Sequence, residues 1–319
     1  MPGTLLNFPE APSANLAQLL EGVDARMRLL TEMHAEWVSD ADPGVSTPAE
    51  YHLRAGGQKV RARLGLSSAL ALGLSDSEAI GIAACAELLH NASLIHDDLQ
   101  DGDLYRRGVP AIWNQFGKNT ALCCGDLFLS AAYAALGGIG NHALLPEALA
   151  LTHRRVAHAV HGQCADLAER PDGGDDVEQY LAIAKSKSGA LLALPIELSL
   201  LLSGNVESIP LATAACENFA ISYQALDDIQ DIAIDAARPA QTVHSGTASA
   251  PALNLVLMLQ NRGQQARALP MAVALATTHL DQCEADAVNL PSGAGRMLLA
   301  YCAGMRTKLD DAVSVLEAC

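Results

Sequence analysis

The chain of 319 residues is predicted to fold as a single all-α domain, a helical bundle, on three observations. First, alanine and leucine dominate a composition that is 50% apolar and only 4% aromatic, which favours helices packed closely through small side chains. Second, no segment alternates valine or isoleucine with polar residues as a half-buried strand would. Third, no low-complexity linker is long enough to separate two domains, so residues 1–319 are expected to form one domain.

The helices are expected in series along the chain. An amphipathic pattern covers residues 16–38, and a loop containing proline and glycine follows at residues 42–48. Ser75 and Glu78 have the spacing of a capping box, which opens a long helix that continues through Asp101. The later helices are expected at residues 117–136, 146–169, 176–202, 211–236 and 253–259, with more helix towards the C-terminus.

Two acidic clusters interrupt this apolar chain: Asp97-Asp98-Leu99-Gln100-Asp101 and Asp227-Asp228-Ile229-Gln230-Asp231. The first and fifth carboxylates of each cluster lie on one face of a helix, about one turn apart. Two such helices facing each other would surround a hard divalent cation with oxygens, and Mg2+ held in this way commonly bridges to substrate phosphates. The expected metal ligands are Asp97, Asp101, Asp227 and Asp231, flanked by Asp98 and Asp228.

A single cluster of this kind is also typical of a solvated helix end. Here each cluster directly follows an apolar stretch, at residues 83–95 and 219–226. Carboxylates so close to a core are costly unless something compensates them. Two copies in that setting favour metal binding.

The overall charge restricts the possible partners. A formal charge of −16 argues against a nucleic-acid or anionic-membrane surface, which would need a basic face. The eight scattered cysteines include no Cys-x-x-Cys pair and indicate a reduced, cytoplasmic protein. No basic signal-peptide segment opens the chain, and the most apolar stretch, residues 189–202, is broken by Pro195 and Glu197. We therefore expect a soluble protein with no transmembrane segment.

Cations are few, and three groups of them lie beside glycine or the acidic clusters: Gly56-Gly57-Gln58-Lys59-Val60-Arg61, Arg106-Arg107-Gly108 and Lys187-Ser188-Gly189. Arginine can bind phosphate through two parallel hydrogen bonds, and a glycine pair lets the backbone approach an anion. The other interpretations are a surface helix start for the first group and a solvated helix end for the second. His90 lies two turns before Asp97, where it is either a core residue or part of the site. There is no Walker loop and no nucleophile elbow.

Together these residues resemble the trans-type isoprenyl diphosphate (polyprenyl) synthases, over about residues 56–231. The stretch His90-Asn91-Ala92-Ser93-Leu94-Ile95-His96-Asp97-Asp98 and the following Arg106-Arg107-Gly108-Val109-Pro110 resemble the family's first aspartate-rich motif. Further counterparts are Gly125-Asp126, Gly162-Gln163 with Asp166-Leu167, Lys187-Ser188-Gly189, and Tyr223-Gln224 before the second cluster.

The resemblance implies a helical bundle with a deep central cavity, of the isoprenoid synthase class I type, and Mg2+-dependent prenyl transfer. In that reaction an allylic prenyl diphosphate loses its diphosphate, and isopentenyl diphosphate attacks the resulting carbocation and then loses a proton. The resemblance assigns Asp97, Asp101 and Asp227 to the metal, Arg106 and Lys187 to the allylic diphosphate, and Arg61, His90 and Arg107 to isopentenyl diphosphate. The other catalytic and substrate-binding positions are Asp98, Asp228, Gln58, Lys59, Ser188 and Gln224. A homodimer is expected from the family.

Three features depart from the family pattern. Gln58 stands where the family has lysine, with Lys59 next to it, and Trp113 stands where histidine is common. Residues 234–246, after the second cluster, contain no lysine. These changes remove cations from the expected diphosphate sites.

Product length is expected from two positions. Family members that stop early tend to have an aromatic residue four or five positions before the first aspartate, and here those positions are Ser93 and Ala92. Both side chains are small, so the expected product is a linear polyprenyl diphosphate of C20 or longer. Two alternatives stay open: a terpene synthase-like lyase that ionises a prenyl diphosphate alone, and a non-catalytic regulatory subunit of a heteromeric synthase.

Overall fold

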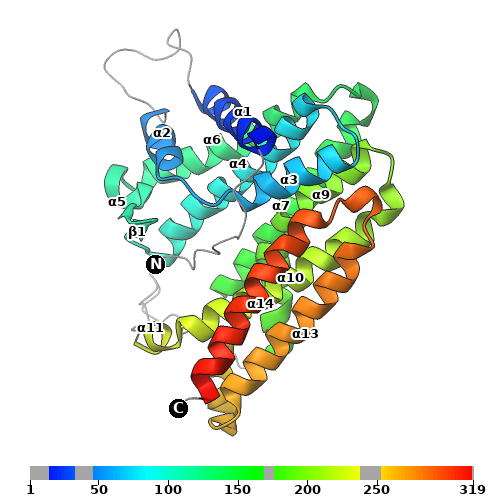
Figure 1. Cartoon of the computed structure of the whole chain (residues 1–319). Coiled ribbons are helices and arrows are strands. Elements are labelled where there is room, and N and C mark those ends of the chain that lie inside the picture. The colour runs from blue at the N-terminus through cyan, green and yellow to red at the C-terminus, as the bar shows by residue number, and fades with distance from the viewer. Residues whose placement is uncertain (1–13, 33–45, 169–175, 238–252, 318–319) are drawn as a thin grey trace.

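The computed structural model describes residues 14–32, 46–168, 176–237 and 253–317, which are almost entirely helical (Figure 1). The expected all-α fold is confirmed. Within the described residues the exception is one short antiparallel pair, β1 (Tyr105–Arg106) and β2 (Val109–Pro110), which the sequence did not predict.

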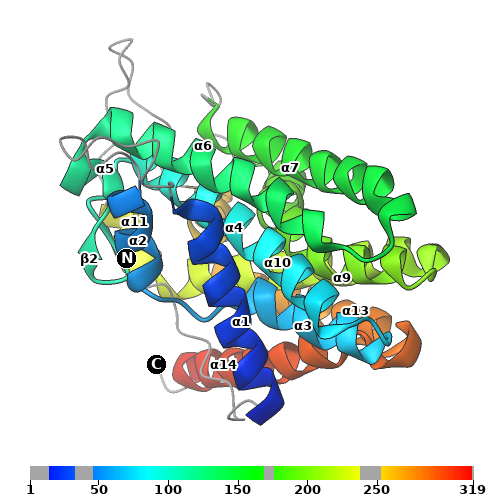
Figure 2. The same cartoon turned by 90° about the horizontal axis from the view of Figure 1, so that it is seen from above.

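The first half of the chain packs around α4 (Asp76–Asp101). Helices α1 (Ala14–Thr31), α3 (Val60–Ala71) and α6 (Lys118–Ala135) lie against it, while the shorter α2 (Ser46–Arg54) and α5 (Ile112–Phe116) lie at the end that carries the strand pair (Figure 2). The capping box is confirmed: the backbone N–H of Glu78 donates to the Ser75 hydroxyl, and that of Ser75 donates to Glu78 Oε2 at 3.1 Å. Fully buried alanines along α4 let its neighbours approach closely.

Two of the described helical segments, α4 and Lys118–Gly138, are long and apolar enough to cross a membrane by length and composition. For α4, however, 72% of the apolar window is buried inside the protein. Its apolar character is therefore explained by its place in the core.

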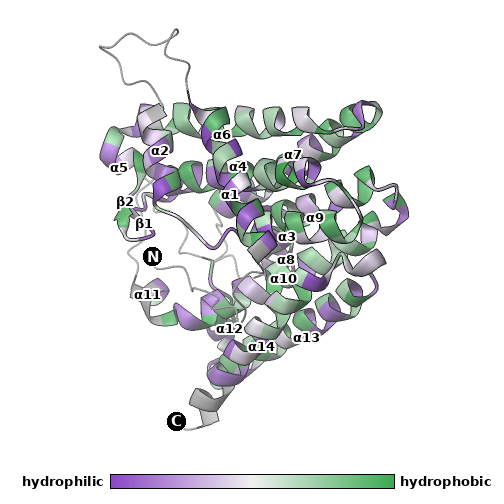
Figure 3. Ribbon diagram, turned by 45° about the horizontal axis from the view of Figure 1, so that its top comes forward, coloured by the Kyte–Doolittle hydropathy of each residue, from purple (hydrophilic) through white to green (hydrophobic). Residues whose placement is uncertain are grey.

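The second half contributes α7 (Leu145–Leu167), α8 (Val177–Ala184), α9 (Ala190–Leu202), α10 (Ile209–Gln230), α11 (Ile232–Ala237), α12 (Leu255–Leu259), α13 (Ala268–Val288) and α14 (Arg296–Glu317). Green and purple residues mix along most of the long helices in Figure 3, as amphipathic helices require. Helix α9 is apolar all round because it packs in two directions. Leu194 and Leu198 join the core around α4, whereas Ile196 and Leu200 join the core around α10.

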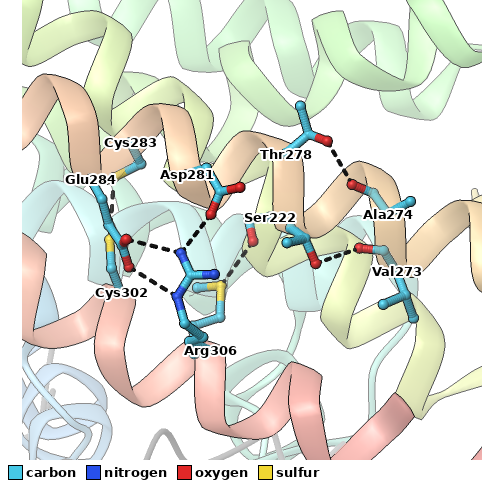
Figure 4. Close-up of polar contacts among 11 residues, drawn as sticks. Ser222, Val273, Ala274, Thr278, Asp281, Cys283, Glu284, Cys302 and Arg306 are labelled. Atoms are coloured by element: carbon cyan, nitrogen blue, oxygen red, sulfur yellow. Dashed lines mark hydrogen bonds and ion pairs between the residues drawn. The ribbon is translucent and has the colours of Figure 1, made fainter.

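Polar contacts tie α13 to α14 (Figure 4). Arg306 donates to Asp281 at 2.7 Å and to Glu284 Oε2 at 2.9 Å. Beside this ion pair, the buried Cys283 and Cys302 sulfurs lie 3.4 Å apart.

Several predicted boundaries are wrong. The helix expected at residues 176–202 is α8 and α9 joined by a π-helical turn, Lys185–Gly189, and the helix expected at 211–236 breaks at Asp231. Part of the loop expected at 42–48 is the start of α2, where Pro48 is tolerated because the first turn lacks intrahelical N–H partners. Residues 33–38 and the lysine-free residues 238–246 lie outside the described part of the chain.

Candidate active site

A cavity of about 280 Å3 lies between α4, α6, α7 and the π-helical turn. Its apolar lining includes Leu89, Leu129, Val156 and Leu191, and the small Ala92 and Ser93 also face it. Its polar lining includes Arg61, His90, Asp97, Gln100, Gln163, Lys187 and Ser188. The cavity therefore combines an apolar wall with a group of polar side chains.

The first acidic cluster forms the last turn of α4. Asp97 lines the cavity, and burial raises its pKa to about 6, against the opposing effect of the Lys187 ammonium and with a further rise from Asp101. Gly102 follows with φ 70°, a left-handed conformation that glycine adopts readily, and turns the chain towards the strand pair.

Asp98 differs from its neighbour. It is 2% exposed and accepts a hydrogen bond from Arg106 Nε at 2.7 Å, with a second contact from the same guanidinium. Burial raises the pKa of Asp98, and Arg106 opposes that rise. Asp98 therefore fixes Arg106 beside the cluster, and its own predicted catalytic role stays a prediction.

The second acidic cluster closes α10. Asp231 is the C-cap, and its backbone N–H donates to the Asp227 carbonyl at 2.9 Å, which keeps the two residues one turn apart. Asp228 is 3% exposed and accepts from Gln224 Nε2 at 2.9 Å and from the Leu255 backbone N–H at 2.8 Å. Burial raises the pKa of Asp228 to about 7.

Tyr223 connects this cluster to the cavity. Burial raises the pKa of Tyr223 to about 12, Asp227 adds to the rise, and Arg61 opposes it. Arg61 lines the cavity, whereas Asp227, Asp228 and Asp231 are not among the residues that line it.

The π-helical turn places Lys187 in the lining of the same cavity as Asp97. Its ammonium donates to Asp166 Oδ2 of α7 at 2.8 Å. Burial disfavours its charge, but Asp166, Asp97 and Asp101 outweigh that effect and raise its pKa. Helix α7 can approach the turn because Gly162 has no side chain: a Cβ there would lie 2.5 Å from the Lys187 backbone nitrogen.

The glycine pair has a role that the sequence did not predict. Arg107 packs its guanidinium over Gly57, whose Cβ, if present, would lie 2.6 Å from Arg107 Cζ. At this position glycine makes room for an arginine from the first motif. Arg61 and His90 lie close by, and Arg61 Nε and His90 Nδ1 are buried without a hydrogen-bond partner among the described residues. Burial, followed by Arg61 and Arg107, lowers the pKa of His90, so its ring is neutral at pH 7.

Glu87 was missed in the sequence. It is 3% exposed, and its Oε2 accepts from the Ala62 backbone N–H at 3.2 Å. Burial raises the pKa of Glu87, and Arg61 is the main opposing charge. A lone carboxylate inside the apolar run of α4 was the available signal, because buried charges are normally paired.

Gln58 and Lys59, two predicted substrate-binding residues, and Trp113, a departure from the family pattern, have other contacts. The Lys59 ammonium pairs with Asp24 of α1. The Gln58 backbone carbonyl accepts from Arg63 Nε at 3.1 Å, and Trp113 Nε1 donates to the Asp103 carbonyl at 2.8 Å. Gln58 and Lys59 are not among the residues that line the cavity, and their substrate-binding roles stay predictions.

The donor set suits Mg2+. Both clusters lie at helix C-termini, where the helix dipole is already negative, so their carboxylates are electrostatically costly without a cation. Within the described part of the chain, no three His, Cys, Asp or Glu side chains converge into a preformed cage. Mg2+ typically uses one or two carboxylates together with waters and substrate phosphates, so it needs no such cage.

A family model described as polyprenyl synthetase matches residues 42–284. The chain is 34% identical to a short chain isoprenyl diphosphate synthase of Methanothermobacter thermautotrophicus over 227 residues, 69% of this chain and 66% of that protein. It is 30% identical to a (2E,6E)-farnesyl diphosphate synthase of Mycobacterium tuberculosis over 224 residues, 70% of this chain and 60% of that protein. Each match thus spans less than two thirds of the curated relative.

Solved structures share the fold. A geranylgeranyl pyrophosphate synthetase from Geoglobus acetivorans aligns with a TM-score of 0.75 and 21% identity over 91% of this chain and 99% of that one. A heptaprenyl diphosphate synthase from Staphylococcus aureus aligns with a TM-score of 0.74 and 16% identity, covering 94% of this chain and 99% of that one.

Proposed function

Because the chain belongs to the polyprenyl synthetase family, we propose that it is a Mg2+-dependent prenyltransferase that condenses an allylic prenyl diphosphate with isopentenyl diphosphate. The observation that carries the proposal is the opposition of Asp97 and Lys187 beside an apolar cavity. A carboxylate and an ammonium placed there can hold a diphosphate through metal and through direct contact, while the prenyl chain occupies the apolar space.

The metal ligands would be Asp97, Asp101, Asp227 and Asp231. When bound, Mg2+ supplies the positive charge that neutralises a departing diphosphate. Lys187 contributes a permanent positive charge on the same side, and Asp166 fixes its direction. The apolar lining excludes water from the allylic carbocation that forms when the diphosphate leaves.

Isopentenyl diphosphate would bind at the other cationic group, Arg61 with Arg107. Two buried atoms with unmet hydrogen-bonding capacity, Arg61 Nε and His90 Nδ1, mark this place. Before substrate binds, Glu87 is the counter-charge of this cationic group.

We propose a product of C20 or longer. The support is that Ala92 and Ser93 face the cavity with small side chains and leave the space beside Leu129 and Val156 open to a growing chain. The proposed assembly is a homodimer in the cytoplasm, as the family resemblance implies. Sedimentation equilibrium would test it: a monomer at micromolar concentration would contradict this assembly.

The decisive experiment is product analysis with Mg2+ and farnesyl diphosphate, with and without labelled isopentenyl diphosphate. Label in a longer prenyl diphosphate supports the synthase, and its length tests the C20 expectation. Farnesyl diphosphate that stays unchanged in both incubations would contradict any catalytic role for this chain alone.

A second candidate is the lyase, favoured by one observation. Gln58 replaces a cation and Lys59 is paired with Asp24, so two positions expected to bind isopentenyl diphosphate supply no free positive charge to it. Release of a hydrocarbon or an alcohol from farnesyl diphosphate without isopentenyl diphosphate would identify this activity.

A further inference from the structure

Asn254 lies where α10, α11 and α12 meet. It is 0% exposed and is the N-cap of α12. Its Oδ1 accepts from the backbone N–H groups of Val256 at 3.0 Å and Leu257 at 3.2 Å. This part of its bonding is ordinary helix capping.

The amide nitrogen of Asn254 makes two contacts that capping does not require. Nδ2 donates to the backbone carbonyl of Asp228 at 2.9 Å and to Asp235 Oδ2 of α11 at 2.9 Å. The Asp228 carbonyl belongs to the last turn of α10, where carbonyls lack intrahelical donors. All four hydrogen-bonding positions of the Asn254 side chain are thus used.

The next residue strengthens the same junction. The backbone N–H of Leu255 donates to the Asp228 carboxylate at 2.8 Å, so Asn254 and Leu255 together hold both the main chain and the side chain of Asp228. Asp228 lies between Asp227 and Asp231 on this turn, so what fixes Asp228 also fixes its two neighbours.

We propose that Asn254 is a positioning residue of the second acidic cluster, holding the last turn of α10 so that Asp227 and Asp231 meet the metal–diphosphate group. The inference rests on the proposed function only in taking Mg2+ and diphosphate as the ligand. The residue type supports it: serine or aspartate could cap α12, but asparagine alone among these supplies two donors to oxygens of Asp228 and Asp235.

The test separates capping from positioning. Asn254→Asp keeps an acceptor for α12 and removes both donors, whereas Asn254→Ser keeps an acceptor and has a single, shorter donor in place of the two amide N–H groups. The matched control is Asn205→Asp, the same chemical change at the turn before α10, where the side chain bonds only to Ser203 among the described residues. The readouts are Mn2+ binding in the presence of inorganic diphosphate, followed by electron paramagnetic resonance, and the melting temperature of the ligand-free protein.

We expect the half-saturating Mn2+ concentration to rise roughly 10- to 100-fold in both Asn254 variants, as is typical when a group that orients a metal ligand is removed. Asn205→Asp should match the wild type, and the KM for isopentenyl diphosphate should stay within about twofold in every variant. If the Asn254 variants melt earlier but bind Mn2+ as tightly as the wild type, Asn254 is a cap only and the proposal is overturned.

Asp235→Ala is a second variant that leaves Asn254 and the core in place. It removes one of the two acceptors of Asn254 Nδ2. The half-saturating Mn2+ concentration should rise, but by less than in the Asn254 variants. Unchanged binding would count against the proposal. A wild type that binds Mn2+ with diphosphate yet elongates no prenyl diphosphate refutes the proposed function alone, and the variants still decide the role of Asn254. A wild type that binds no Mn2+ refutes both.

Discussion

Adjacent aspartates of identical chemistry have different positions in this protein. Asp97 faces the cavity and Lys187, whereas Asp98 is buried against Arg106. The same division recurs in the second cluster, where Asp228 is buried against Gln224 and Leu255. In each cluster the second aspartate is buried and holds structure in place, and in the first cluster Asp97 lines the cavity.

Asp97→Ala and Asp227→Ala should each lower kcat by at least on the order of 10²- to 10³-fold, because each removes a carboxylate proposed to hold the Mg2+ that would neutralise the departing diphosphate. Neither should lower the melting temperature, since neither side chain contributes to core packing. Steady-state kinetics and thermal unfolding check both statements. Asp281→Ala, at an exposed ion pair on α13, is the control and should retain wild-type turnover. Near-full activity in either cluster variant would refute the site.

His52 makes stability depend on pH. It is 4% exposed and hydrogen-bonded to Asn91, and burial lowers its pKa to about 4. Below its unfolded pKa of about 6.5 the unfolded chain binds a proton that the folded protein does not, so stability is lost as pH falls from 6.5 towards 4. Because of His52, the free energy of unfolding falls by about 2 kcal/mol between pH 7.5 and pH 5.

His52→Gln should remove that contribution and flatten the pH dependence of the free energy of unfolding, measured by urea denaturation at each pH. The exposed His153→Gln on α7 is the control and should keep the wild-type slope. Equal slopes in wild type and His52→Gln would show that His52 is not buried as a neutral ring.

At the scale of elements, the π-helical turn brings Lys187 to the proposed allylic site. A π-helical turn inside an α-helix is rare and commonly marks a functional site. Here it joins α8 to α9, packs against Gly162 of α7, and places Lys187 in the cavity lining, hydrogen-bonded to Asp166. The π-helical turn therefore depends on the close approach of α7 to the segment that joins α8 and α9.

Gly162→Ala should displace this turn, because its Cβ would lie 2.5 Å from the Lys187 backbone nitrogen. We expect a stability loss of about 1–3 kcal/mol from overpacking and a fall in kcat/KM for the allylic substrate of roughly 10- to 100-fold from the misplaced Lys187. Urea denaturation and steady-state kinetics measure these effects. Gly137→Ala, where a Cβ meets nothing within 4 Å, should change neither quantity.

At the scale of the whole molecule, the cavity is made by helices distant in sequence. Three apolar walls from α4, α6 and α7 enclose it, and the polar groups gather where α3, α4 and the π-helical turn approach. Its usable length is therefore a property of the packed bundle.

Ser93→Phe should shorten the product by at least one five-carbon unit, because the ring would occupy the space that Ser93 leaves in the cavity. Chromatography of the labelled products measures the length. Ser130→Phe adds the same ring on the exposed face of α6 and should leave the product unchanged. An unaltered length in Ser93→Phe would place the growing chain elsewhere.

The sequence by itself determined the helices, the capping box at Ser75 and the pairing of acidic clusters with a few cations. These features are local: helical periodicity, caps and the spacing of like residues are written within one or two turns. Tertiary structure alone decided that Asp98 and Asp228 are the buried aspartates of their clusters, that Arg107 covers Gly57, that Lys59 pairs with Asp24, and that residues 185–189 form a π-helical turn. Each of these depends on contacts between segments far apart in the chain, whose packing sets burial and charge pairing, and no local pattern encodes that packing.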